Sequence, residues 1–277
     1  MNQLSLTSTV TLANGVKMPK IGLGVFKVEK EDELLTAVNA AIETGYRSID
    51  TASIYGNEEW VGKAIRQSGL KREELFITSK VWNADQGYEE TLQAFNTSMV
   101  KMGLDFLELY LIHWPVEGKY ADTWRALEQL YWEGKIKAIG VSNFQVHHLE
   151  ELLKTAEIKP MINQIELHPK LSQKEICSFA ARHDMQIEAW APLMQGGLFE
   201  NEVLNGLAKK HGKSIAQIIL RWHLQNDIII IPKSTKPYRI KENADLFGFE
   251  LSAEDISLID SLNEDLRVGP DPNHFDF

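Results

Sequence analysis

Short runs of β-branched and other apolar residues alternate with longer stretches of helical periodicity along the chain. The runs begin near Ile21, Arg47, Phe76, Leu107, Ile136, Met161, Gln186 and Ile228. Successive runs lie about 25 to 31 residues apart, and only the last step, of about 42 residues, leaves room for an additional helix. Eight strand–helix units in roughly 250 residues predict an α/β fold of the (β/α)8 TIM barrel type rather than an open doubly wound sheet.

The stretches between the runs carry helix signals. From Glu31 to Glu43, one helical face collects the apolar residues Leu34, Leu35, Val38, Ala41 and Ile42. Ser172 with Glu175, and Ser252 with Asp255, have the spacing of a capping box, so a helix is predicted to begin after each serine. The second of these helices lies near the chain end, and with the helix in the long seventh connection it gives two helices beyond the barrel.

A hairpin is expected before the first run. Thr9 to Met18 alternates apolar and polar residues around Asn14-Gly15, a dipeptide typical of a type I′ turn. We expect this N-terminal β-hairpin to plug the bottom of the barrel. No linker rich in Pro, Gly or Ser and no block of like charge interrupts the pattern, so residues 1–277 are predicted to form a single barrel domain.

Composition and charge narrow the class of protein. The chain is 44% hydrophobic and 25% charged, which is typical of a globular protein. Its formal net charge of −10 disfavours nucleic acid and anionic membranes as partners. A single cysteine, Cys177, excludes an intrachain disulfide and is expected to be buried and inert. The opening MNQLSLTSTV has no signal-peptide pattern, so we expect a cytoplasmic protein.

Polar residues stand where most of the predicted strands end. They are Asp50, Lys80, His113, Ser142, Asn143, Gln164 and Lys233. The carboxyl ends of barrel strands converge on one mouth, where barrel active sites are built. The sequence therefore predicts a functional site at that end of the barrel.

Several familiar motifs are incomplete or have the wrong spacing. Gly22-Leu23-Gly24 lacks the third glycine of a dinucleotide fingerprint, and the stretch from Gly206 to Ser214 has one residue too many for a phosphate loop. Gly140-Val141-Ser142-Asn143 lacks the second glycine of a hydrolase elbow. The adjacent His147 and His148 do not have metal-ligand spacing and are expected to be solvated, so no metal site is predicted.

Asp50, Tyr55, Lys80 and His113 form a set suited to carbonyl reduction. A phenol of ordinary pKa near 10 becomes a useful acid near neutrality only if a neighbour favours its anion, and the Lys80 ammonium does so. The Asp50 carboxylate keeps the lysine charged, and the His113 imidazole orients the substrate oxygen. The alternative is a structural ion pair between Asp50 and Lys80 with a core tyrosine and histidine.

The chain resembles the aldo-keto reductase family over essentially its whole length. The resemblance lies in the segments GYRSIDTASIYGNE, ITSKVW, LYLIHWP, IGVSNF, NQIELHP and IPKSTKPYRIKENA, which follow one another in family order. It implies a monomeric (β/α)8 barrel that reduces aldehydes and ketones with NADPH. It also implies that Tyr55 is the general acid, that Lys80 and Asp50 tune it, and that His113 positions the carbonyl.

The resemblance further implies a cofactor site and a substrate pocket. Ser142, Asn143 and Gln164 match the residues that hold the nicotinamide carboxamide, and Trp190 matches the aromatic that stacks on the ring. The 2′-phosphate is assigned to Lys233, Ser234 and Arg239, the adenine end to Glu242 and Asn243, and further cofactor contacts to Leu193 and Gln195. The substrate-binding residues are Phe26, Trp82, His113 and Trp114.

The chain departs from the family pattern in two places. Trp190 replaces a tyrosine, and the tail GPDPNHFDF lacks the long loop that encloses substrates in many animal members. The tail resembles that of the bacterial branch with glyoxal, methylglyoxal and 2,5-diketogluconate reductases, so small aldehydes and dicarbonyls are the expected substrates. Two alternatives remain, a nucleotide-binding regulatory subunit of barrel fold and a lyase that forms a Schiff base on Lys80.

Overall fold

A parallel sheet forms the centre of the computed structural model, which describes residues 4–277. Met1 to Gln3, the start of the segment in which no targeting signal is expected, lie outside the described residues. The strands of this sheet are β3 (Leu23–Gly24), β4 (Ser48–Asp50), β5 (Phe76–Val81), β6 (Leu107–Ile112), β7 (Ile136–Ser142), β8 (Ile162–Glu166), β9 (Gln186–Trp190) and β10 (Ile229–Ile230). Each begins within two residues of its predicted start.

The sheet closes on itself. Its strands are ordered from β3 to β10 in sequence order, and parallel bridges join Ile21 to Ile230 and Gly24 to Lys233. The Gly22 amide donates to the Ile230 carbonyl at 2.8 Å across this seam. The glycines allow the close approach, since a Cβ on Gly24 would lie 2.9 Å from the Ile231 carbonyl oxygen. The predicted barrel is therefore confirmed.

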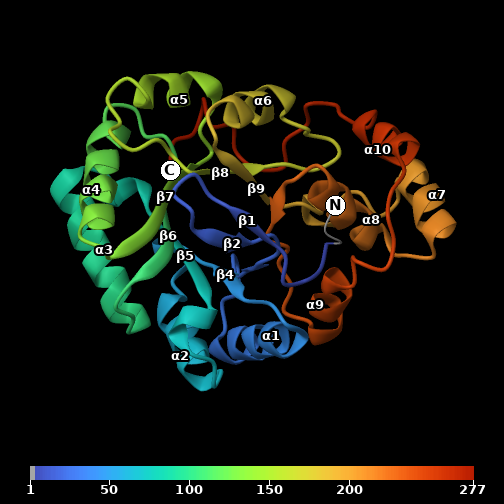
Figure 1. Cartoon of the computed structure of the whole chain (residues 1–277), viewed down its shortest axis with the longest axis horizontal. Coiled ribbons are helices and arrows are strands. Elements are labelled where there is room, and N and C mark those ends of the chain that lie inside the picture. The colour runs from blue at the N-terminus through green and yellow to red at the C-terminus, as the bar shows by residue number, and fades with distance from the viewer. Residues whose placement is uncertain (1–3) are drawn as a thin grey trace.

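Helices surround the barrel on all sides (Figure 1). The eight that follow the strands are α1 (Glu31–Thr44), α2 (Glu58–Gln67), α3 (Tyr88–Met102), α4 (Tyr120–Trp132), α5 (Val146–Leu152), α6 (Lys174–Arg182), α8 (Ile215–Gln225) and α9 (Pro237–Ala244). Single 3-10 turns lie at η1 (Ser53–Tyr55), η2 (Arg72–Glu74), η3 (Asn83–Asp85) and η4 (Met194–Gly196). The predicted apolar stripe of α1 is buried at Leu34, Val38 and Ala41 and half-buried at Leu35 and Ile42.

The two further helices that the sequence predicts are present as α7 (Glu202–His211) and α10 (Ala253–Asp260). They pack beside each other. Ser252 and Asp255 form the predicted capping box of α10. Asp255 is nearly fully buried and also accepts hydrogen bonds from Lys210 at 2.6 Å and His211 at 2.9 Å, both on α7. One carboxylate thus caps α10 and fastens it to α7.

The capping box predicted at Ser172 is wrong. Helix α6 begins one residue later, after Gln173, whose φ of 48° is left-handed and whose side chain does not cap the helix. The Ser172 amide donates instead to Asn263 Oδ1 at 2.8 Å, in the segment after α10. A contact with a residue far along the chain therefore replaces the local cap.

The hairpin of β1 (Thr9–Thr11) and β2 (Lys17–Pro19) is present, but its predicted turn type is wrong. The Gly15 amide donates to the Leu12 carbonyl at 2.8 Å, and of the dipeptide Asn14-Gly15 only the glycine has a positive φ. This is a type I turn closed by a left-handed glycine, whereas type I′ needs both central residues left-handed.

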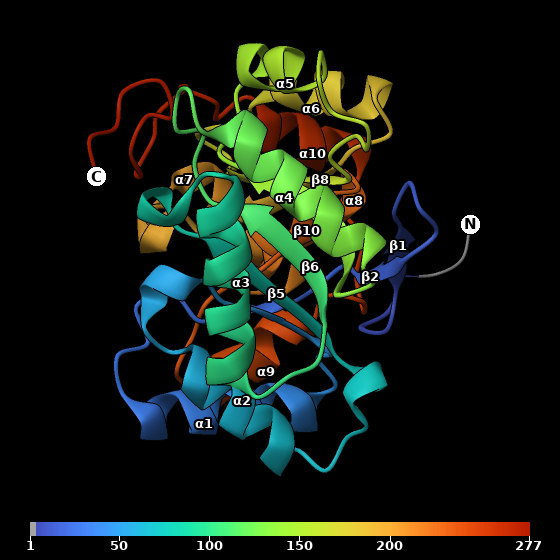
Figure 2. The same ribbon diagram turned by 90° about the vertical axis from the view of Figure 1, so that its left-hand side faces the viewer.

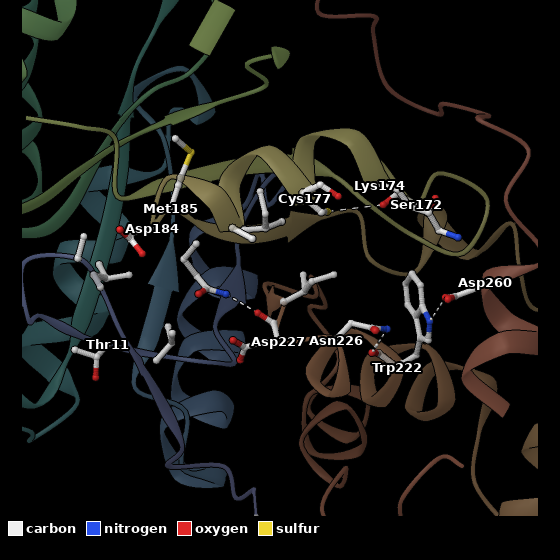
Figure 3. Close-up of a pocket in the computed structure, with 18 residues that line it drawn as sticks. Thr11, Ser172, Lys174, Cys177, Asp184, Met185, Trp222, Asn226, Asp227 and Asp260 are labelled. Atoms are coloured by element: carbon white, nitrogen blue, oxygen red, sulfur yellow. Dashed lines mark hydrogen bonds between the residues drawn. The ribbon is translucent and has the colours of Figure 1, made fainter. Parts of the chain in front are cut away.

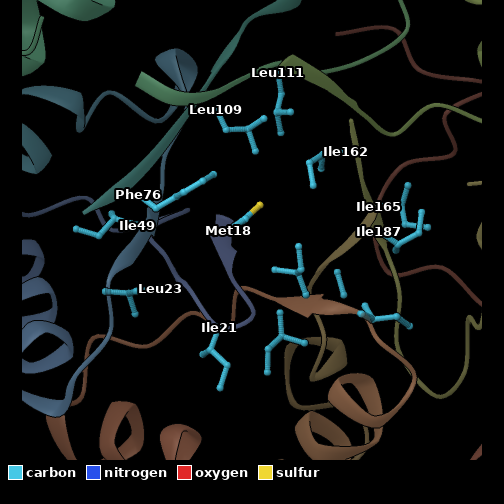
Figure 4. Close-up of a cluster of buried hydrophobic side chains, with 14 of the residues drawn as sticks. Met18, Ile21, Leu23, Ile49, Phe76, Leu109, Leu111, Ile162, Ile165 and Ile187 are labelled. Carbon is cyan, nitrogen blue, oxygen red and sulfur yellow. The ribbon is translucent and has the colours of Figure 1, made fainter. Parts of the chain in front are cut away.

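The hairpin closes one end of the barrel, opposite the chain's C-terminus (Figure 2). Met18 is fully buried, and its side chain points into the cluster of apolar residues inside the barrel (Figure 4). Asn14 fixes the hairpin tip by donating to the Lys137 carbonyl at 2.8 Å. The expected plug at the bottom of the barrel is therefore confirmed.

The paired histidines have different surroundings. His147 is exposed as expected, but His148 is half-buried and lies edge-on to Phe144 and Tyr120. Its Nδ1 accepts the Gln145 amide at 3.1 Å, which caps α5. Burial, together with His147, lowers the pKa of His148 to about 4. The expected solvation is wrong for His148 because the aromatic cluster covers it.

Cys177 on α6 is half-buried rather than fully buried. Burial raises the pKa of its thiol to about 11, which agrees with an inert residue. None of the helices formed by residues 4–277 is long and apolar enough to cross a membrane.

Gly62 marks a close crossing of α2 and α3. A Cβ at this position would lie 1.9 Å from the Met102 carbonyl oxygen, so the two helix backbones would have to separate. Gly206 in the interior of α7 is the natural comparison, because a Cβ there has nothing within 4 Å.

We predict opposite effects of alanine at these two glycines. Gly62→Ala should lower the free energy of unfolding by about 1–3 kcal/mol or more through overpacking. Gly206→Ala should raise it by about 0.5–1 kcal/mol because alanine is the better helix former. Urea unfolding followed by circular dichroism measures both values, and a Gly62→Ala protein as stable as wild type would contradict the close crossing.

Candidate active site

The polar residues predicted at the strand ends gather at the end of the barrel opposite the hairpin. Asp50 ends β4, Lys80 lies near the end of β5, and His113 follows β6 directly. Ser142 ends β7, and Gln164 lies in β8. The C-terminus lies at this same end (Figure 2).

A buried ion pair lies at the centre of this end of the barrel. Lys80 has no exposed surface, and its Nζ donates to Asp50 Oδ1 at 2.7 Å and to the Thr51 carbonyl at 2.9 Å. Burial by itself favours the neutral amine, but Asp50 and Tyr55 outweigh it and raise the pKa of Lys80. The side chain is therefore a protonated ammonium at neutral pH.

Tyr55 lies beside this ammonium on η1, directly after β4. Its ring centroid is 5.2 Å from Lys80 Nζ and 4.9 Å from the ring of Phe26. Burial raises the pKa of the Tyr55 phenol above its ordinary value, while Lys80 acts in the opposite direction. Lys80 lowers the pKa of Tyr55, as expected. The pKa is nevertheless raised overall, because burial has the larger effect.

His113 completes the group of four. Its ring lies 5.7 Å from Tyr55 and 5.1 Å from Trp82, and only 7% of the residue is exposed. Burial and the Lys80 charge lower its pKa well below 6.5, so the imidazole is neutral. Its Nδ1 is buried with no hydrogen-bond partner among the described residues, which favours the tautomer with the proton on Nε2.

The three residues expected at the nicotinamide carboxamide have most of their donors in use. Ser142 Oγ donates to the Gln164 carbonyl at 2.8 Å, and Asn143 Nδ2 donates to the His113 carbonyl at 3.0 Å. Gln164 Nε2 donates to Asp50 Oδ2 and to Glu188 Oε2, both at 2.8 Å. Acceptor oxygens of these side chains remain, so the set fits the N–H₂ group of an amide ligand.

Trp190 ends β9 and is half-buried. Its indole Nε1 donates to Asn143 Oδ1 at 2.8 Å, which a tyrosine could not do from the same ring position. A Cβ on Gly269 would lie 2.3 Å from the Trp190 ring, so the chain after α10 packs directly against the indole. The tryptophan at this position thus forms a hydrogen bond from the edge of its ring and still presents a flat face.

The residues expected at the far end of the nucleotide follow β10. Lys233 and Arg239 are exposed, whereas Ser234 is buried and its Oγ accepts the Lys236 amide at 3.1 Å. Arg239, Glu242 and Asn243 belong to α9, which packs against α1 and α8 outside the barrel. Leu193 and Gln195 lie in the loop after β9, around η4, where Gln195 has a φ of 53°.

Aromatic side chains line the mouth, and some come from a segment whose role the sequence reasoning missed. Phe26, Trp82 and Trp114, which are expected to form the pocket wall, lie in a cluster of aromatic side chains with Tyr55, His113 and the tail. Phe277 stacks on Trp82 at 5.7 Å and meets Trp114 edge-on at 5.2 Å, while Phe275 lies 5.2 Å from Trp114. The tail therefore packs on two residues of the expected pocket wall, whereas the sequence indicated only that a long enclosing loop is missing.

Glu166 holds the beginning of this tail. Its carboxylate accepts the Val268 amide at 2.7 Å and the Gly269 amide at 3.1 Å, and it bonds His168 at 3.0 Å. Glu166 and His168 are both completely buried. The segment NQIELHP carried these residues, but only their spatial position shows the link to the tail.

A cavity of about 860 Å³ opens elsewhere, between the hairpin, α6 and α8 (Figure 3). None of the predicted site residues lines it. Two of its polar side chains bond other lining residues, since Trp222 Nε1 donates to Asp260 at 2.9 Å and Asn226 Nδ2 donates to the Trp222 carbonyl at 3.0 Å. The chemistry-bearing side chains are at the opposite end of the barrel.

Comparison with known proteins agrees with this geometry. A model of the aldo/keto reductase family matches residues 20–264. The chain is 64% identical to glyoxal reductase of Bacillus subtilis (strain 168), covering 99% of each chain, and 46% identical to methylglyoxal reductase DkgA of Escherichia coli (strain K12), covering 97% of this chain and 98% of that protein. Among solved structures, a variant of Gox0644 in complex with NADPH is 42% identical, with a TM-score of 0.93 over 98% of this chain and 99% of that one. With its closed barrel and its polar mouth, the chain belongs to the aldo/keto reductase family.

Proposed function

We propose that the protein reduces small aldehydes, ketones and dicarbonyls to alcohols with NADPH, and that Tyr55 is the general acid. The observation that carries the proposal is the buried ion pair between Asp50 and Lys80 beside Tyr55 and the neutral His113. Matched relatives that are reductases of glyoxal and methylglyoxal support the substrate class. A monomeric, cytoplasmic enzyme remains an expectation from the sequence.

The four side chains have complementary tasks in such a reduction. Two of the three N–H groups of Lys80 are used by Asp50 and Thr51, which leaves one for the Tyr55 oxygen. As Tyr55 gives its proton to the carbonyl oxygen, the developing phenolate is stabilised by the adjacent ammonium. His113, protonated on Nε2, donates a hydrogen bond to the same carbonyl oxygen and holds it in place.

NADPH, when bound, supplies the hydride that reduces the carbonyl carbon. The half-buried indole of Trp190 offers a flat surface for the nicotinamide ring. Gln164 fits the carboxamide because its Nε2 is saturated and its oxygen is the group left to accept a hydrogen bond. Lys233 and Arg239 place two exposed cations near the first turn of α9, which suits a phosphate group.

The geometry argues against the two alternatives. A lyase needs Lys80 as a neutral, accessible amine, but the side chain is fully buried, charged and bonded to Asp50. A purely regulatory barrel would not need the Tyr55 phenol to lie close to both the Lys80 ammonium and the neutral His113 imidazole. We therefore keep the reductase as the single proposal.

The first test removes the proposed acid. Tyr55→Phe should lower the turnover of methylglyoxal by about 100-fold to 10,000-fold. The reason is that Tyr55 is the only proposed general acid among the described residues that lie next to Lys80 and His113. NADPH affinity, measured by quenching of tryptophan fluorescence, should stay nearly unchanged. Turnover near the wild-type rate in a folded Tyr55→Phe protein would remove Tyr55 from this role.

The second test concerns the choice of cofactor. Arg239 is exposed, and no ion pair within residues 4–277 occupies it, so its guanidinium can meet a 2′-phosphate. Arg239→Ala should weaken NADPH by about 10-fold to 150-fold, the worth of a charge-assisted contact, and should change NADH little. Arg125→Ala on α4 controls for the loss of one surface charge. An unchanged ratio of the two dissociation constants would exclude Arg239 from the site.

The third test concerns substrate size. Phe275 and Phe277 pack on Trp82 and Trp114 across the mouth, which favours compact carbonyl compounds. Methylglyoxal and aromatic aldehydes should be reduced with a higher kcat/KM than any steroid ketone, because the mouth offers little surface for the far end of an extended molecule. A steroid that exceeds every small aldehyde in kcat/KM would contradict this prediction.

A further inference from the structure

A second carboxylate is buried below the site, and the mechanism above does not use it. Glu188 lies in β9, is 1% exposed and stands opposite Gln164 in the register of β8 and β9. Its Oε2 accepts from Gln164 Nε2 at 2.8 Å. Its Oε1 is buried and has no hydrogen-bond partner among the described residues. A buried carboxyl group with half of its capacity unused calls for an explanation.

The bond from Gln164 to Glu188 fixes the orientation of the glutamine amide. The two hydrogens of Nε2 go to Asp50 Oδ2 and to Glu188 Oε2, both at 2.8 Å. Turning the amide over would place its oxygen against the Asp50 carboxylate and against Glu188 Oε2, so the observed orientation is preferred. The Gln164 oxygen is thereby directed away from them. Without Glu188, one N–H would lose its partner and the amide could rotate.

The charges around Glu188 are arranged unevenly. It faces Asp50 from β4, Lys80 from β5, Tyr55 from η1 and the Gln164 amide from β8, while its register partner in β10 is the apolar Ile229. The ammonium of Lys80 bonds Asp50 and not Glu188. Burial, with the charge of Asp50, raises the pKa of Glu188 to about 8.

We propose that Glu188 is a positioning residue for the reaction: it holds the Gln164 amide so that its oxygen meets the nicotinamide carboxamide. The proposal rests on the proposed function. It predicts an effect on nicotinamide binding that can be measured separately from turnover.

Two substitutions separate this role from a general effect on stability. A glutamine at position 188 keeps one acceptor oxygen for Gln164 Nε2, whereas a leucine removes it.

The binding experiment compares Glu188→Leu and Glu188→Gln with wild type, using NADPH and 2′,5′-ADP, which lacks the nicotinamide. Glu188→Leu should weaken NADPH on the order of 10-fold, the range of coupling between residues in one network, and should change 2′,5′-ADP less than about 2-fold. Glu188→Gln should keep both affinities within about 3-fold. Glu128→Gln, which alters another buried carboxylate on α4, serves as the matched control and should change neither ligand.

Two results of this experiment would overturn the positioning role. One is a Glu188→Leu protein that binds NADPH as tightly as wild type. The other is an equal loss of affinity for both ligands, which would indicate general damage to the fold. The experiment does not depend on turnover, so it decides the role of Glu188 even if wild type reduces no carbonyl compound and the proposed function fails.

Discussion

The ion pair between Lys80 and Asp50 is the interaction on which the polar end of the barrel depends. A fully buried ammonium is costly to desolvate and is stable here only because Asp50 and the Thr51 carbonyl take two of its three hydrogens. Removing one member of such a pair leaves an uncompensated charge inside the protein, which typically costs about 3–5 kcal/mol. The stability of the barrel and the charge state of the site therefore both depend on the Lys80–Asp50 ion pair.

The same pair starts a chain of bonds across the barrel interior. Asp50 gives one oxygen to Lys80 and the other to Gln164, and Gln164 continues to Glu188. These residues come from β4, β5, β8 and β9, so strands on opposite sides of the barrel are joined. A buried polar network of this kind is stable only when nearly all of its donors and acceptors have hydrogen-bond partners. Glu188 Oε1, which has none among the described residues, is therefore an exception within the network.

The two ends of the barrel are built for different purposes. At one end, the hairpin covers the opening with an apolar plug centred on Met18. At the other, charged and amide groups lie buried beneath the mouth, and the tail brings Phe275 and Phe277 against Trp82 and Trp114 of the expected pocket wall. Glu166 anchors this tail next to Trp190, so the face expected to meet the nicotinamide and the wall of the pocket are linked through one segment.

The sequence by itself determined the strand starts, the two extra helices and the polar residues of the mouth. These features depend on short-range periodicity, on local caps such as Ser252 with Asp255, and on the rule that barrel loops converge. Only the tertiary structure decided which helix crosses closely at Gly62, why His148 is covered, where the tail packs and that Glu188 joins Gln164. Each of these is a contact between separate elements of the fold, and periodicity along the chain carries no information about such contacts.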